Sequence, residues 1–138
     1  ANVIDSVARY TALPVRPQGV IVPLSSTAIM QYPLLYLTGH LPVRFTEREA
    51  ETLRRYLARG GLLFVDDHNH DVDGAFNKTA REEIRRVAGP LVPLPNTHEL
   101  YRCFFVFENG PPTTSHEMNG WGDNLVHEHL DAVLHEGR

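Results

Sequence analysis

The residues with the greatest capacity for chemistry lie in one short stretch. Between positions 66 and 73 the chain carries six carboxylate or imidazole side chains: Asp66, Asp67, His68, His70, Asp71 and Asp73. Carboxylate and imidazole groups together suit divalent cations such as Zn²⁺, Mn²⁺ or Fe²⁺. We therefore expect a divalent metal as the candidate cofactor. Its expected ligands are Asp67, His68, His70 and Asp73, and Asp66 and Asp71 are expected to bind ligand beside them.

This stretch has two further interpretations besides a transition-metal site. An EF-hand calcium loop would begin at Asn69 and needs a glutamate at its twelfth position, which is Ala80 here, so that loop is excluded. Aspartates also form turns by accepting hydrogen bonds from nearby backbone N–H groups. A capped structural turn therefore stays open beside the metal site.

The flanking elements are expected to place this stretch at one edge of a sheet. Two apolar runs, 33–38 and 62–65, predict strands that are covered on both faces, as in a parallel sheet. Between them Thr46 and Glu49 form a capping box that opens a helix, and Gly60-Gly61 ends it. Strand, helix and strand in this order predict a parallel βαβ unit. Ligands of such sheets bind at the carboxyl ends of the strands.

Three further histidines are candidate ligand-binding residues. His40 directly follows the first strand, so it is expected within reach of Asp67 or His68. His98 and His116 each precede a glutamate and could join the same site, although each could equally fix a loop through a backbone hydrogen bond. His127, Asp131 and His135 are four residues apart, so they would share one face of a helix. We expect this face to be solvated rather than to bind a metal.

The rest of the chain predicts a mixture of helices and strands. Apolar periodicity, caps and strand-forming composition predict helices over 2–10, 79–88 (opened by a capping box at Thr79–Glu82) and 123–134, strands over 19–24 and 103–107, and a short strand or extended segment over 91–95. The aromatic residues are expected to pack in the core, although they could also line a pocket or a partner surface: Tyr101, Phe104, Phe105, Phe107 and Trp121.

Composition sets limits on the class of protein. A chain of 138 residues predicts a single domain over 1–138. A net charge of −4 gives no electrostatic reason to expect nucleic acid as a partner. No apolar run approaches the ~18 residues of a membrane span, so no transmembrane segment is expected. The single cysteine, Cys103, cannot form an internal disulfide.

The chain resembles the bacterial family catalogued as domain of unknown function 4159. The resemblance runs from about residue 20 onward and rests on the segments 32–40, 53–57 with 60–67, 94–95 with 98–101, 110–112, 116–117 and 119–123. It implies a flavodoxin-like fold, similar to class I glutamine amidotransferases: a three-layer α/β/α sandwich with a mostly parallel sheet. Measured against this fold, the chain is expected to be incomplete at both ends.

The resemblance implies no known reaction. Amidotransferase chemistry needs a cysteine nucleophile after the strand, and Asp66-Asp67-His68 stands there instead. An extracytoplasmic location is what the resemblance implies. We therefore expect a non-catalytic ligand-binding or protein-interaction module, with protein partners in a larger assembly. The alternative is a metal-dependent hydrolase, in which the metal at Asp67, His68 and His70 activates a water molecule.

Overall fold

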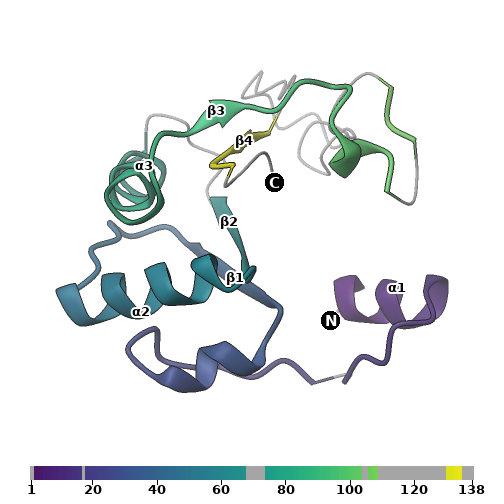
Figure 1. Ribbon diagram of the computed structural model, residues 1–138, viewed down its shortest axis with the longest axis horizontal. Coiled ribbons are helices and arrows are strands. Elements are labelled where there is room, and N and C mark those ends of the chain that lie inside the picture. The colour runs from purple at the N-terminus through teal and green to yellow at the C-terminus, as the bar shows by residue number, and fades with distance from the viewer. Residues whose placement is uncertain (1, 17, 68–73, 104–105, 109–129, 135–138) are drawn as a thin grey trace.

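The computed structural model describes residues 2–16, 18–67, 74–103, 106–108 and 130–134 (Figure 1). In Figure 1 the helices α2 and α3 lie to the left of the strands β1 and β2, and α1 lies apart on the right. The elements of the described residues are, in chain order, α1 (Asn2–Tyr10), the 3-10 helix η1 (Thr27–Gln31), β1 (Leu34–Gly39), α2 (Glu47–Ala58), β2 (Leu62–Asp67), α3 (Ala75–Ala88), β3 (Val92–Pro93), the 3-10 helix η2 (Glu99–Tyr101) and β4 (Asp131–Ala132).

The β1–α2–β2 unit confirms the parallel βαβ prediction. β1 and β2 are paired in parallel, from Leu34 opposite Leu62 to Gly39 opposite Asp67. The capping box that opens α2 is present: the Thr46 hydroxyl accepts from the Glu49 N–H, and the Glu49 carboxylate accepts from the Thr46 N–H at 2.8 Å. After α2 the chain turns through Gly60, whose φ of 87° is in the left-handed region. Local sequence signals therefore define this unit.

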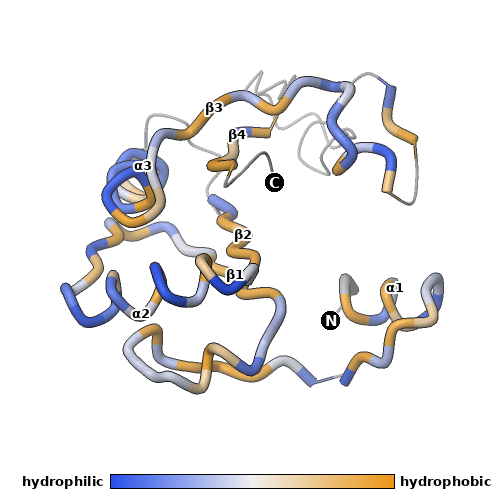
Figure 2. Tube along the Cα trace, viewed as in Figure 1, coloured by the Kyte–Doolittle hydropathy of each residue, from blue (hydrophilic) through white to orange (hydrophobic). Residues whose placement is uncertain are grey.

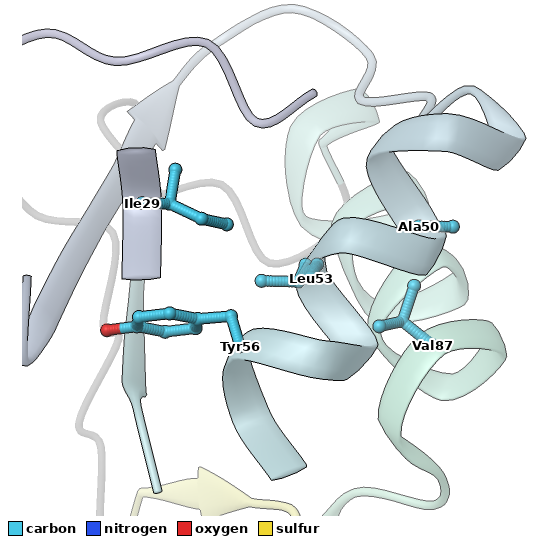
Figure 3. Close-up of a cluster of buried hydrophobic side chains, with 5 residues drawn as sticks. All are labelled: Ile29, Ala50, Leu53, Tyr56 and Val87. Atoms are coloured by element: carbon cyan, nitrogen blue, oxygen red, sulfur yellow. The ribbon is translucent and has the colours of Figure 1, made fainter. Parts of the chain in front are cut away.

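The core lies between α2 and the elements on its two sides (Figure 3). Leu53 lies at its centre and is fully buried. The half-buried Leu35 of β1 and Leu63 of β2 pack against this cluster and join the sheet to the helix. The buried members come from η1, α2 and α3: Ile29, Ala50, Leu53, Tyr56 and Val87.

Tyr56 connects α2 to the strand that follows it. Its hydroxyl donates a hydrogen bond to the Leu62 carbonyl at 3.1 Å, and its side chain is buried. The ring lies so close to Gly61 that a Cβ atom there would be 2.3 Å from it. Burial raises the pKa of Tyr56, although backbone hydrogen bonds partly offset this effect. The glycine at 61 is therefore required by the close approach of the ring.

A buried carboxylate, Glu83, fixes α3 to the segment before α2. It accepts hydrogen bonds from the Arg86 guanidinium at 2.6 Å and from the Phe45 N–H at 3.3 Å, and Arg44 lies 3.6 Å away. Burial opposes the ionisation of Glu83, but these hydrogen bonds and the two positive charges outweigh it. The pKa of Glu83 is therefore lowered from its ordinary value. A charge in the interior is tolerated because it is paired and hydrogen-bonded.

The prediction of a mostly parallel three-layer α/β/α sandwich, flavodoxin-like or class I glutamine amidotransferase-like, is wrong. The described residues contain a two-stranded parallel sheet, β1–β2, and a separate two-stranded antiparallel sheet, β3–β4. The expected strand over 19–24 is not formed: Val20 and Ile21 are exposed, and the segment ends in a turn in which the Ser26 N–H donates to the Pro23 carbonyl. Proline has no N–H to donate to a neighbouring strand, which weakens strand formation there.

The helix expected over 123–134 is contradicted in the part that the structure describes. Residues 130–134 are not helical, and Asp131–Ala132 forms β4, which pairs antiparallel with Val92–Pro93 of β3. The short-strand alternative for 91–95 is thereby confirmed. Asp131 forms an ion pair with Arg81 at 2.6 Å. The prediction that His127, Asp131 and His135 share a helical face is therefore wrong for Asp131, which lies in β4. The two histidines lie outside the described residues.

The start of α3 also differs from its prediction. No capping box forms at Thr79–Glu82, because the helix already begins at Ala75, with Gly74 as its N-cap residue. Phe76 is buried and extends the apolar face of the helix toward its N-terminus. The Thr79 hydroxyl instead donates to the Ala75 carbonyl at 2.6 Å and accepts from the Val43 N–H at 2.8 Å. Thr79 therefore makes a tertiary hydrogen bond with Val43 instead of capping the helix.

Two other predictions are settled in part. The expected helix over 2–10 is confirmed as α1. Of the expected strand over 103–107, Cys103, Val106 and Phe107 lie in no strand, and 104–105 lie outside the described residues. In the part of the chain that the structure describes, no helix has both the length and the apolarity to cross a membrane.

Substitution of Gly61 by alanine should destabilise the fold. The new Cβ would meet the Tyr56 ring at 2.3 to 2.5 Å, and the ring is held by its hydrogen bond to Leu62. We expect the free energy of unfolding to fall by about 1–3 kcal/mol in urea titrations, as in overpacked cores. Gly19→Ala is the matched control, since nothing lies within 4 Å of a Cβ there. Equal stability of the two variants would contradict this packing.

Substitution of Glu83 by glutamine should destabilise the protein at neutral pH and less so in acid. Because the folded pKa is lowered, the contribution of Glu83 is complete above its unfolded pKa of about 4.3 and is lost as the pH falls through the folded pKa. We expect a loss of roughly 1–2 kcal/mol at neutral pH. Urea titrations at several pH values between neutrality and about pH 3 measure it.

The control for this prediction is Glu82→Gln, which removes an exposed carboxylate paired with Arg44. Its effect at neutral pH should be the smaller one, because exposed ion pairs contribute little. A difference between wild type and Glu83→Gln that stays constant from neutral to acid pH would show that the ionised form of Glu83 does not stabilise the fold.

Candidate functional site

The carboxyl ends of β1 and β2 meet at one edge of their sheet, as the βαβ prediction required. Thr38 lies opposite Asp66 and Gly39 lies opposite Asp67, and His40 follows directly after β1. His40 is exposed, and Asp66 and Asp67 are half-buried. The structure therefore brings the backbone of His40 and of Asp67 to the same end of the sheet.

The two aspartates point to opposite faces of the sheet. Successive side chains alternate along a strand, so Asp66 lies on the face of Leu62 and Phe64, and Asp67 lies on the face of Leu63 that packs on α2. Asp66 accepts a hydrogen bond from the Tyr36 hydroxyl at 2.5 Å. This hydrogen bond, together with partial burial and the charge of Asp66, raises the pKa of Tyr36. Asp66 thus belongs to a different surface from Asp67.

The other predicted site residues divide into two groups. His98 lies at the N-terminus of η2, where its Nδ1 accepts from the Leu100 N–H at 3.2 Å. This hydrogen bond agrees with the alternative role of His98, which is to fix a loop through a backbone hydrogen bond. The remaining candidates lie outside the described residues, and their assignment stays a prediction: His68, His70, Asp71, Asp73 and His116. Among the described residues alone, no group of three or more His, Cys, Asp or Glu side chains could hold a metal ion.

The structure also reveals an apolar surface that sequence reasoning missed. We call it the outer face: the side of the β1–β2 sheet opposite α2, formed by Leu34, Tyr36, Leu62 and Phe64. These side chains are 47%, 58%, 56% and 46% exposed, respectively. The rings of Tyr36 and Phe64 are stacked, with centroids 5.7 Å apart and planes inclined by 13°. In Figure 2, β2 is orange along most of its length and turns blue at its carboxyl end.

The prediction that both faces of these strands are covered is therefore wrong. Exposure alternates along β1 and along residues 62–65 of β2, and among the described residues only the face toward α2 is packed. Because the apolar runs are continuous, their sequence carries no period-two pattern from which an exposed face could be recognised. One signal was available: Tyr36 and Phe64 are aromatic residues at corresponding positions of two strands that a parallel register would pair.

The comparison with known families agrees with the resemblance. A family model described as "Domain of unknown function (DUF4159)" matches residues 1–138, so the match includes the first twenty residues as well. No curated protein matches the chain.

The predicted metal site can be tested by elemental analysis of the purified protein. If Asp67, His68, His70 and Asp73 hold a divalent cation, the protein should retain about one Zn²⁺, Mn²⁺ or Fe²⁺ per chain after incubation and dialysis. His68→Ala and His70→Ala should each lose it. Asp66→Asn is the matched control, because Asp66 points to the other face and binds Tyr36. Absence of stoichiometric metal from the wild type would contradict the metal assignment and favour the turn interpretation.

Proposed function

The chain belongs to the family described as domain of unknown function DUF4159, and for this member we propose that the domain is a protein-interaction module. In this proposal the outer face binds an amphipathic helix of another protein outside the cytoplasm, the location that the family resemblance implies. One observation carries the proposal: four large apolar side chains on one face of a parallel sheet are each about half exposed.

The first argument for this function is the free energy available at the outer face. Parallel sheets occur almost only with both faces covered, and here α2 covers one face. Covering a half-exposed leucine or phenylalanine removes enough apolar surface to contribute roughly 1 kcal/mol per side chain. A contiguous apolar surface of this kind marks an interaction site more often than scattered apolar residues do.

The second argument concerns the kind of partner. The inner face is covered by a helix whose apolar residues repeat at helical spacing, Ala50, Leu53 and Leu57. An amphipathic helix is the element that fits the outer face in the same way, because helices are the usual cover of parallel sheets.

Charge at one end of the outer face further restricts the partner. Asp66 follows Leu62 and Phe64 on the same side of β2 and accepts from the Tyr36 hydroxyl. An amphipathic helix that carries a lysine or arginine at this end, next to its apolar stripe, would therefore match both the apolar residues and the carboxylate.

Photo-crosslinking tests this function directly. With p-benzoylphenylalanine at position 64 we expect, in the native host, an adduct with a second protein at a segment that forms an amphipathic helix. The same group at position 41 is the matched control, because Leu41 is 68% exposed but lies in the loop after β1. A synthetic peptide of the crosslinked segment should then bind the purified domain. Phe64→Glu should weaken its Kd about tenfold or more, and Leu41→Glu should not.

Two outcomes would contradict this function. An adduct from position 64 only with a second copy of this chain would make the outer face a self-association surface. Equal adducts from positions 64 and 41, or equal peptide binding by wild type and Phe64→Glu, would show that the outer face is not the docking surface.

A further inference from the structure

A surface hollow is lined by residues that take no part in the proposed protein interaction. It lies between η1 and the C-terminal turn of α2 and has a volume of about 400 Å³. The hollow is open to solvent, because four of its five lining residues are exposed and Met30 is half-buried. Its lining is formed by Thr27, Met30, Arg55, Ala58 and Arg59.

The two arginines give this hollow a positive charge. Arg55 lies in the last turn of α2 and Arg59 directly follows the helix, and both line the same hollow, where like charges repel. Arg55 lies 3.7 Å from Glu51, a long and exposed ion pair. Arg59, at the end of the helix, forms no ion pair with any residue in the described part of the chain. A bound anion would relieve the repulsion between the two guanidinium groups.

The remaining lining residues indicate the class of ligand. Guanidinium groups bind phosphate and carboxylate through paired N–H donors. The hydroxyl of Thr27 adds a third donor, and Met30 and Ala58 add an apolar surface. Three donors suit the three terminal oxygens of a phosphate monoester better than the two oxygens of a carboxylate. We propose that this hollow binds a small phosphate monoester with an apolar substituent, such as an aryl or alkyl phosphate.

Arginines at the C-terminal end of a helix can also have a purely structural role, which predicts a different experimental result. Cations in the last turn of a helix stabilise it through the helix dipole, and this effect needs no ligand. Arg55 lies in the last turn of α2, and its neighbour Arg54 carries the same charge at the same distance of 3.7 Å from Glu51, so an effect of net charge alone on anion binding should be alike for the two. Only Arg55 lines the hollow. Arg54→Gln is therefore a matched control for Arg55→Gln.

Titration of the full chain with phenyl phosphate, followed by NMR chemical shifts and calorimetry, tests the site. We expect saturable binding, with shift changes at Thr27, Met30 and Ala58. Arg55→Gln and Arg59→Gln should each weaken the Kd about tenfold, and Arg54→Gln less than about twofold. Inorganic phosphate should bind more weakly than phenyl phosphate because it lacks the apolar substituent. Benzoate should also bind more weakly, because its carboxylate has two oxygens in place of three. Circular dichroism confirms that each variant is folded.

Three results would overturn this proposal. The first is no saturable binding of phenyl phosphate up to about 10 mM. The second is equal weakening by Arg54→Gln and Arg55→Gln, which would reflect net charge alone. The third is benzoate binding as tightly as phenyl phosphate. None of these results bears on the crosslinks from position 64, which lies on the opposite side of the sheet from α2, so the two proposals can fail separately.

Discussion

The packing of Tyr56 is the interaction on which the rest of this structure depends. Its ring closes the space between α2 and the turn into β2, and its hydroxyl holds the first residue of that strand. Ile29, Leu53 and Val87 complete the same cluster from three different elements (Figure 3). A core this small depends on each large side chain, since removing one from a packed core costs several kcal/mol. The direction of β2, and with it the position of its carboxyl end, follows from this contact.

Among the described residues, only one face of the β1–β2 sheet is covered. The inner face of β1 and β2 is joined to α2 through Leu35 and Leu63, and α3 is fixed beside it by the ionised Glu83. The outer face remains apolar and half exposed. In the part of the chain that the structure describes, the packing therefore lies on one side of the sheet, and the apolar side chains of the other side are left half exposed. The two aspartates at the carboxyl end of β2 are separated in the same way: Asp66 lies on the outer face, and Asp67 lies on the inner face.

Sequence reasoning succeeded where a structure depends on neighbouring residues. The Thr46–Glu49 capping box, the left-handed glycine at 60 and the parallel pairing of β1 with β2 all follow from local signals. It failed where distant segments meet. The Thr79 hydroxyl accepts from Val43, and residues 131–132 pair with β3, although the local sequence favoured a helix cap and a helix there.

For the candidate site, the sequence by itself determined which residue types gather after β2 and that a parallel unit would bring the ends of β1 and β2 together. These are local properties of caps, glycines and apolar runs. Only the tertiary structure decided that β2 extends to Asp67, which places Asp66 and Asp67 on opposite faces, and that Tyr36 and Phe64 are stacked on a half-exposed face. The pairing register and the one-sided packing of α2 fix these features, and continuous apolar strands carry no pattern that reveals them.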